Sequence, residues 1–167
     1  MSAKSTTETN ETATVLTRSE EQAVKDTWAL VYINSRSNGL ELFLRLFKQI
    51  PHAKGYFEKF KDEPEENLKQ SDELKFHVGK MMDSLNVLVG NLGNKEFLVT
   101  ETQTIARDHK NRSVTSQDFK LVFEILQNML KDKLGDKYNA ATEVSWKKCC
   151  DVIWNIVDAE MKRHVET

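Results

Sequence analysis

Hydrophobic residues recur every three or four positions along most of the chain, which is the period of one face of an α-helix. The clearest stripe follows Thr115 and comprises Phe119, Val122, Phe123, Leu126, Met129 and Leu130. No stretch alternates in the way that a half-buried β-strand does. The pattern therefore predicts an all-α fold of seven or eight helices in one domain.

Capping residues and helix breakers divide the pattern into segments. Thr17 with Glu20, and Thr115 with Asp118, have the spacing of helix-starting capping boxes. Gly135 is placed to end the helix that starts at Thr115. The first expected helix runs from Thr17 to the region 35–39, the second from about 40 to Pro51, and a short third one opens at Pro51. A long helix is expected over about 71–89, followed by one of about a dozen residues that ends at His109. The last two are expected over 115–135 and about 137–163.

Two segments lack the helical pattern. Residues 1–15 are polar, rich in Thr and Ser and without period, so we expect a disordered tail ahead of one domain that spans 16–167. Residues 61–67 are charged and contain Pro64, which predicts a mobile connection between two helices.

The composition excludes several classes of partner and location. The 167 residues carry 24 Lys and Arg against 26 Asp and Glu, so the net charge of −2 gives no reason to expect nucleic acid or a membrane as a partner. No apolar run approaches the roughly twenty residues of a membrane span, and the N-terminus lacks the apolar core of a signal peptide. We therefore expect an intracellular, cytoplasmic protein.

The two cysteines, Cys149 and Cys150, are neighbours within a helical pattern. Neighbouring side chains on a helix point about 100° apart, so a disulfide between them is geometrically poor. We expect two reduced thiols, one packed beside Trp146 and Ile153 and the other turned outward. A disulfide between two chains through the outward thiol is the less favoured alternative.

Two of the four histidines fall on apolar helical faces. The faces comprise Leu74, His77, Val78, Met81 and Leu85 for one, and Leu98, Thr102, Ile105 and His109 for the other. A single histidine in such a place is most often a core or rim residue with a satisfied hydrogen bond. Two imidazoles on facing apolar surfaces are also what a helical protein needs to hold a haem iron. His52 and His164 are expected at the surface, and no arrangement of residues resembles a catalytic triad or a zinc site.

The order and spacing of several segments, covering nearly everything from Leu16 to His164, resemble those of the globin family. Trp28 resembles a landmark of the first helix in that family. The other segments that carry the resemblance are GLELFLRLFKQIPHAKGYFEKF at 39–60 (second helix, proline-opened third helix and corner), LKFHVGKMMDSL at 74–85 (distal helix), ARDHKNRSV at 106–114 (proximal segment) and SWKKCCDVI at 145–153 (last helix). The resemblance implies the globin fold, with its helices around a haem pocket.

The same resemblance implies the cofactor and its ligands. The cofactor is haem b (iron protoporphyrin IX), held without covalent bonds because the chain has no Cys-x-x-Cys-His attachment sequence. His109 is assigned as the proximal iron ligand and His77 as the distal histidine, with the metal-binding set limited to these two. The implied cofactor-binding residues are Phe43, Phe57, Phe60, His77, Lys80, Met81, Ile105, His109, Val114 and Phe119.

Some of these positions have a second interpretation. Lys80 and Arg112 lie where globins often pair a basic group with a haem propionate, but each is almost equally well explained as a solvated surface cation. Phe43 and Met81 replace the smaller Leu and Val that are frequent at their positions, so we expect a crowded distal side. Phe43, Met81 and His77 are expected to meet above the iron.

The resemblance implies binding of O₂ and other diatomic gases such as CO and NO, and a protein that is not an enzyme. The favoured interpretation is reversible O₂ binding for transport or storage, with His77 donating a hydrogen bond to the gas. The alternative is a six-coordinate, bis-histidyl globin with a redox or nitric-oxide-related function, in which His77 binds the iron. The separation of the two histidines occurs in globins of both kinds. Homodimer formation is also left open, because some invertebrate globins dimerise through the two helices that flank the haem.

Overall fold

The computed structural model describes residues 16–163, so the predicted tail at 1–15 lies outside the described residues. Within that range the chain forms α-helices and 3₁₀-helices and no strand, which confirms the all-α prediction. The elements are α1 (Arg18–Tyr32), α2 (Ser35–Gln49), η1 (Pro51–Tyr56), α3 (Glu65–Leu68), α4 (Asp72–Gly90), α5 (Lys95–Lys110), α6 (Ser116–Leu134), η2 (Gly135–Lys137) and α7 (Ala140–Lys162).

The predicted helix starts agree with the structure where a side-chain cap sets them. Thr17 and Thr115 both form the capping boxes that the sequence predicts, and the short helix η1 opens at Pro51. The start of α2 was wrongly predicted, because α1 ends at Tyr32 and α2 begins at Ser35. The Asn38 side chain stabilises this tight junction by donating a 2.8 Å hydrogen bond to the Val31 carbonyl near the end of α1, which also accepts from the Asn34 N–H at 3.3 Å.

The segment predicted as a connection, residues 61–67, contains the start of a helical turn. α3 covers Glu65–Leu68, and the Leu68 side chain is buried in the core. Burial of the Leu68 side chain thus holds the end of this charged segment against the body of the protein.

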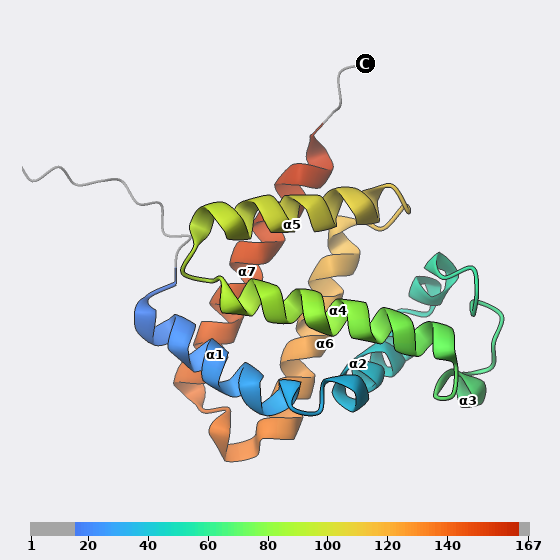
Figure 1. Cartoon of the computed structure of the whole chain (residues 1–167), viewed down its shortest axis with the longest axis horizontal. Helices are drawn as coiled ribbons and strands as arrows, with labels where there is room; N and C mark the ends of the chain where they lie inside the picture. Colours follow the sequence, from blue (N-terminus) through green and yellow to red (C-terminus); the bar gives the residue numbers. More distant parts are fainter. Residues whose placement is uncertain (1–15, 164–167) are drawn as a thin grey trace, which may run out of the picture.

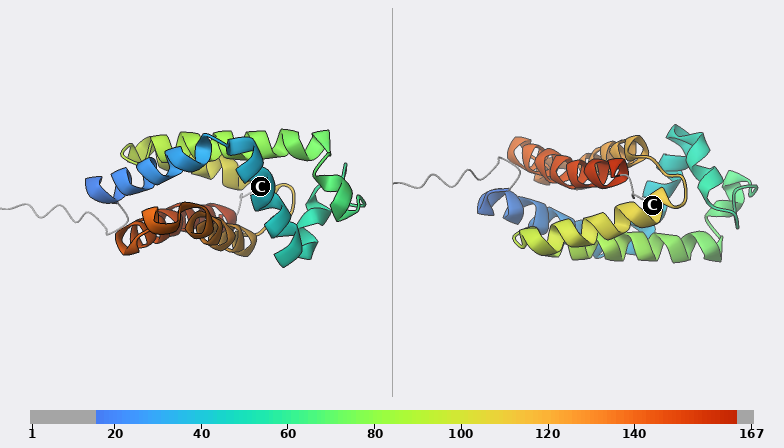
Figure 2. Two further views of the ribbon diagram at one scale, coloured as in Figure 1. Left: turned by 90° about the horizontal axis from the view of Figure 1, so that it is seen from below. Right: turned by 90° about the horizontal axis from the view of Figure 1, so that it is seen from above.

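The helices form two layers (Figure 2). α1, α4 and α5 lie on one side, and α6 and α7 lie on the other. α4 and α5 run beside each other in opposite directions, while η1 and α3 lie at the end where α4 begins (Figure 1). This arrangement brings the start of α4, the end of α5 and the start of α6 to the same end of the molecule.

Two buried tryptophans hold the layers together at α1. The Trp146 indole N–H of α7 donates to Thr27 Oγ1 at 2.8 Å, and the Trp28 indole N–H donates to Asn86 Oδ1 of α4 at 3.0 Å. Both tryptophans are 2% exposed, and their rings fill the core. Each buried indole N–H has a hydrogen-bond acceptor, as a buried polar group requires. These contacts fix α4 relative to α7.

The thiols differ from the prediction that one of them points outward. Cys149 is 1% exposed and Cys150 is 4% exposed, because α7 packs against α1, α5 and α6 and leaves little of its circumference open. Burial raises the pKa of the Cys149 thiol to about 12. The prediction of an outward thiol is therefore wrong, and both cysteines are inert core residues.

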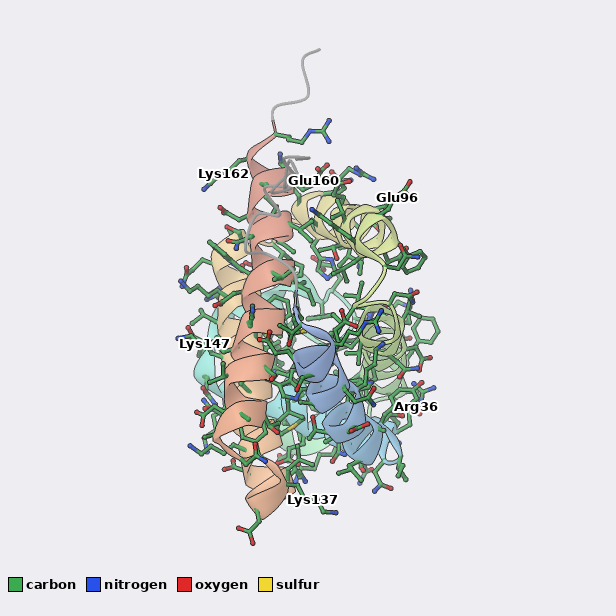
Figure 3. All side chains as sticks on the ribbon, turned by 90° about the vertical axis from the view of Figure 1, so that its left-hand side faces the viewer. Arg36, Glu96, Lys137, Lys147, Glu160 and Lys162 are labelled. Atoms are coloured by element: carbon green, nitrogen blue, oxygen red, sulfur yellow. The ribbon has the colours of Figure 1, made fainter. Side chains whose placement is uncertain are left out.

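Charged side chains such as Lys137, Lys147 and Lys162 project away from α7 and its entry turn, as Figure 3 shows. Glu160 of α7 is the exception, because it is buried. It forms ion pairs with Arg107 of α5 and with Arg163, each at 3.1 Å. Burial alone would raise the pKa of Glu160, but the hydrogen bonds from the two arginines outweigh it and lower the pKa. Within residues 16–163, no helix is long and apolar enough to cross a membrane.

The crossing of α2 and α4 depends on Gly39. A Cβ atom built on Gly39 would lie 2.6 Å from Met82 Cγ and 2.7 Å from Val78 Cγ1, both closer than real contacts allow. The missing side chain lets the two helix backbones approach and sets the position of the first half of α4.

We expect Gly39→Ala to lower the free energy of unfolding by about 1–3 kcal/mol, the usual cost of overpacking a core. Urea denaturation followed by circular dichroism measures this change. Gly55→Ala is the matched control, because a Cβ there meets nothing within 4 Å. Equal stability of the two variants would contradict the close crossing.

Candidate functional site

The two histidines of the apolar faces lie at the same end of the molecule. His77 belongs to the second turn of α4, which Ser71 starts by accepting a hydrogen bond from the Leu74 N–H. His109 belongs to the last turn of α5. In Figure 1 both of these helix ends lie toward η1 and the start of α6. Because α4 and α5 run in opposite directions, the imidazole from the start of one helix and the imidazole from the end of the other belong to the same end of the molecule.

The His109 ring is held in one orientation and one tautomer. Its Nδ1 lies 2.7 Å from the carbonyl oxygen of Ile105, one turn earlier on α5. Because a carbonyl oxygen only accepts hydrogen bonds, Nδ1 is the nitrogen that donates here, which leaves Nε2 as the nitrogen that could bind a metal. The Phe119 ring packs edge-on against His109 with 5.0 Å between ring centroids. Two contacts thus hold the His109 ring, and its Nε2 is the nitrogen not used by the backbone hydrogen bond.

A tight turn after His109 brings α6 back against it. The Val114 N–H donates to the His109 carbonyl at 3.1 Å and the Ser113 N–H donates to the Lys110 carbonyl at 3.0 Å, which is the pattern of a Schellman helix end. Ser113 has a φ of 67°, in the left-handed region that favours glycine. The chain accepts this strain at the residue that redirects it toward Phe119.

Aromatic rings surround His77 on the side of the η1 corner. The Phe57 ring lies 5.2 Å from the imidazole and the Phe60 ring 6.1 Å away, both in edge-on geometry. Phe57 and Phe60 stack on each other at 4.8 Å. Burial, followed by the positive charges of Lys80 and Arg112, lowers the pKa of His77 below its ordinary value of 6.5. The imidazole is therefore neutral at pH 7, with one N–H to donate.

Phe43 and Met81 border the distal side in different ways. Phe43 is buried and packs edge-on against Phe57 at 5.8 Å, so it contacts the ring that contacts His77. Met81 is half-buried at the edge of the core, one turn after His77 on α4. The aromatic cluster continues through Phe47, which lies 5.7 Å from Phe57. This side of the site is densely filled with rings.

The remaining predicted residues lie around the rim. Lys80 is exposed, and its ammonium lies 5.0 Å from the Phe76 ring centroid. Arg112 follows His109 by three residues and is exposed, yet its charge acts on His77. The segments that carry the two histidines therefore border one region. Ile105 and Val114 are half-buried beside it.

These residues fit a haem better than a bare metal ion. Among residues 16–163, no group of three or more His, Cys, Asp or Glu side chains is arranged to hold a metal. Two imidazoles from separate helices suit a planar group that brings four nitrogen ligands of its own. The half-buried ring of Phe57, backed by the buried ring of Phe60, offers an apolar wall to such a plane, and the basic side chains of Lys80 and Arg112 suit its carboxylates.

One cluster next to the site was not predicted. His52, expected as a plain surface histidine, has a side chain that is 62% exposed, and its Nε2 lies 2.9 Å from Asp118 Oδ1. Tyr56 donates a 2.8 Å hydrogen bond to the other carboxylate oxygen. These partners lie more than sixty residues from Asp118 in the chain, so no local sequence signal connects them.

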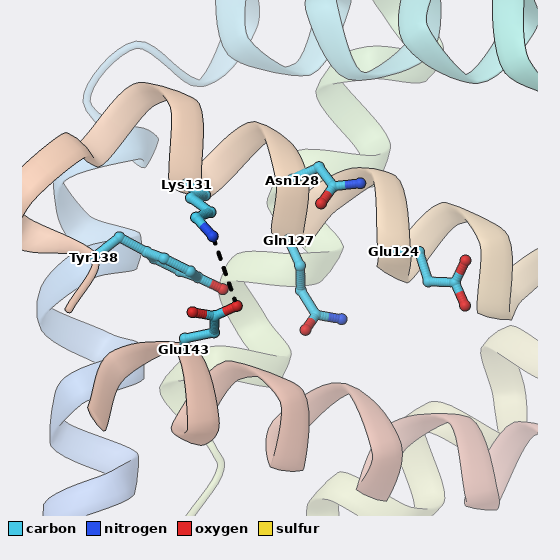
Figure 4. Close-up of a pocket in the computed structure, with 6 residues that line it drawn as sticks. All are labelled: Glu124, Gln127, Asn128, Lys131, Tyr138 and Glu143. Carbon is cyan, nitrogen blue, oxygen red and sulfur yellow. Dashed lines mark ion pairs between the residues drawn. The ribbon is translucent and has the colours of Figure 1, made fainter. Parts of the chain in front are cut away.

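A separate polar hollow of about 320 Å³ lies between α6 and α7 (Figure 4). An ion pair between Lys131 and Glu143, at 3.9 Å, crosses it, and the buried Tyr138 hydroxyl has no hydrogen-bond partner within the described part of the chain. The hollow takes no residue from the histidine-bearing segments. Its lining residues are Glu124, Gln127, Asn128, Lys131, Tyr138 and Glu143.

The comparisons with known proteins identify the family to which this all-α fold belongs. The family model described as Globin matches residues 40–157, and the chain belongs to the globin family. Globins bind haem and, through it, diatomic gases, so the family supports haem-based gas binding.

Several relatives cover most of the chain. It is 29% identical to a globin of Nerita albicilla over 89% of this chain and 94% of that protein. It is 30% identical to cytoglobin-2 of Danio rerio over 92% of this chain and 87% of the relative. It is also 29% identical to a protein of Brassica napus that is named an anaerobic nitrite reductase, over 89% and 94% of the two chains.

We expect Ser113→Gly to raise the free energy of unfolding by about 0.5–1 kcal/mol, because glycine adopts the left-handed conformation without strain. Urea denaturation of the haem-free protein measures this. Ser84→Gly, at an exposed position within α4, is the control and should lower stability by about 0.5 kcal/mol. A loss of stability in Ser113→Gly would show that the serine side chain itself holds the turn.

Proposed function

We propose that this protein binds O₂ reversibly at a ferrous haem b held between α4 and α5, for oxygen transport or storage. The observation that carries the proposal is the 2.7 Å hydrogen bond from His109 Nδ1–H to the Ile105 carbonyl. It leaves Nε2 free to bind iron and makes that nitrogen more basic, as the hydrogen-bond partners of metal-binding histidines do. When bound, the haem supplies the iron atom to which a diatomic gas attaches.

His77 is the residue that we assign to the gas. Its lowered pKa keeps the imidazole neutral, so it offers an N–H to a ligand rather than a positive charge to the pocket. That N–H would donate a hydrogen bond to a gas ligand that carries partial negative charge. The neighbouring rings of Phe57 and Phe60 restrict the entry of water, which favours the ferrous state.

The rest of the pocket would hold the haem by its faces and its edge. The half-buried side chains of Phe57 on the distal side, and of Ile105, Val114 and Phe119 on the proximal side, would offer apolar contacts to the macrocycle. Phe60 is buried and was predicted to line the site, but it would support Phe57 from behind. Lys80 and Arg112 offer cations to the propionates. Non-covalent attachment follows from the absence of a Cys-x-x-Cys-His sequence.

We expect His109→Ala to weaken haem retention by more than about a hundredfold, because even the loss of a group that only orients a metal ligand costs about 10–100-fold in affinity. Haem transfer to an excess of a scavenging apoprotein, followed by absorption, measures this. Asp108→Ala, at the exposed neighbouring position, is the control and should retain haem normally. If His109→Ala keeps its haem and its spectrum, another residue binds the iron.

A second function is supported by the relatives. Proteins of Brassica napus and Physcomitrium patens at 29% and 26% identity are named anaerobic nitrite reductases. In that alternative His77 itself binds the iron until a ligand displaces it, and the protein has a redox or nitric-oxide-related role. The neutral state of His77 is compatible with both roles, since an imidazole needs a free lone pair to bind iron.

Ligand kinetics of His77→Leu separate the two functions. If His77 donates to O₂, the variant should release O₂ on the order of tenfold faster, the value of one hydrogen bond to a charged acceptor. Phe43→Leu should speed O₂ escape more modestly, because it loosens the ring packing around Phe57. Lys75→Leu places the same side chain on the exposed face of α4 and is the control.

Stopped-flow CO binding to the reduced proteins tests the alternative, in which removal of the His77 imidazole speeds ligand binding. Slow capture that saturates with CO in the wild type, and becomes fast and linear in His77→Leu, would show that His77 competes for the iron. Linear capture in both proteins supports the donor role.

A further inference from the structure

Asp118 is a buried carboxylate with more partners than a helix cap requires. As the third residue of α6 it accepts a 3.0 Å hydrogen bond from the Thr115 N–H and completes the capping box. Its carboxylate also accepts from the Tyr56 hydroxyl at 2.8 Å and lies 2.9 Å from His52 Nε2. Only 7% of the residue is exposed, so these donors replace water around the charge.

The hydrogen bonds to Asp118 stabilise its negative charge, and that charge in turn strengthens the hydrogen bond from Tyr56. Burial alone would raise the pKa of Asp118, but hydrogen bonds from Thr115, His52 and Tyr56 outweigh burial and lower the pKa. Burial, together with the hydrogen bond to Asp118 and its charge, raises the pKa of Tyr56 to about 12. At neutral pH a neutral phenol therefore donates to an ionised carboxylate, which is a strong type of hydrogen bond.

The position of this bond matters because each partner precedes a ring of the site. Tyr56 is followed by Phe57, whose ring lies 5.2 Å from His77. Asp118 is followed by Phe119, whose ring lies 5.0 Å from His109. Two contacts, from His52 and from Tyr56, thus join η1 to Asp118 of α6, and the one from Tyr56 links the residue before the distal ring to the residue before the proximal ring.

We propose that the Tyr56–Asp118 hydrogen bond is a brace that sets the spacing between Phe57 and Phe119, and thereby the orientation of both histidines toward the haem. Tyr56 and Asp118 are then positioning residues for the site, outside its lining. The inference rests on the proposed haem function. It differs from a capping role, because a cap needs the bonds of Asp118 to Thr115 and not the bond to Tyr56.

Tyr56→Phe tests the brace, since it removes one hydroxyl and leaves the cap of α6 intact. Tyr32→Phe is the matched control, because Tyr32 also donates to an aspartate, Asp83, at 2.9 Å, but joins α1 to α4. The readouts on the reduced protein are the iron–histidine stretch, the C–O stretch of the CO form, and the rate of haem loss. We expect Tyr56→Phe to shift or broaden both bands and to speed haem loss about fivefold. Tyr32→Phe should leave all three unchanged.

Hydrogen exchange on the haem-free proteins tests the brace without the cofactor. We expect faster amide exchange in η1 and in the first turn of α6 for Tyr56→Phe, and no such change for Tyr32→Phe. Faster exchange with unchanged vibrational bands would overturn the positioning role and leave a purely structural bond. Unchanged exchange would overturn the brace itself. A wild-type protein that shows no iron–histidine band would instead contradict the proposed haem ligation, whatever the exchange results.

Discussion

The hydrogen bond from His109 to the Ile105 carbonyl is the interaction on which this account of the site depends. A histidine at the end of a helix has two ring nitrogens and several rotamers, and either nitrogen could take part in a hydrogen bond. The bond to Ile105 engages Nδ1 with a backbone acceptor that is fixed within α5, and leaves Nε2 for another partner. The edge-on contact with Phe119 holds the same ring from α6. The proximal side is therefore organised by the protein's own contacts.

The distal side is organised differently, by packing and desolvation. His77 has aromatic neighbours, and burial with nearby cations keeps its imidazole neutral. Its place depends on the first half of α4, which in turn depends on the close approach of α2 at Gly39. The close packing of α2 against α4 at Gly39 thus sets the position of the His77 imidazole.

Sequence pattern predicted the features that depend on local chemistry. Capping boxes at Thr17 and Thr115, Pro51 at the start of η1, and the apolar stripes are all encoded within a few residues. The features that it missed depend on long-range contacts. The end of α1 is stabilised by Asn38 from the next helix, and the burial of Cys150 needs neighbours from several helices.

The candidate site shows the same limit. Helical periodicity placed His77 and His109 on apolar faces, but the ring contacts of Phe57 and Phe119 come from other segments of the chain. The second role of Asp118 is a further case. Its capping function is visible in the Thr115–Asp118 spacing, whereas its bonds to His52 and Tyr56 exist only in the folded chain. Resemblance to a family supplied roles that periodicity left open.

The visible absorption spectrum of the reduced, unliganded protein tests the central claim most directly. The claim is that His109 is the one protein ligand of a haem iron and that His77 remains free to donate to a gas. It predicts one haem per chain and a single broad visible band, which is typical of an open sixth position. Two sharply split bands would contradict it, because they would mean that both histidines bind the iron.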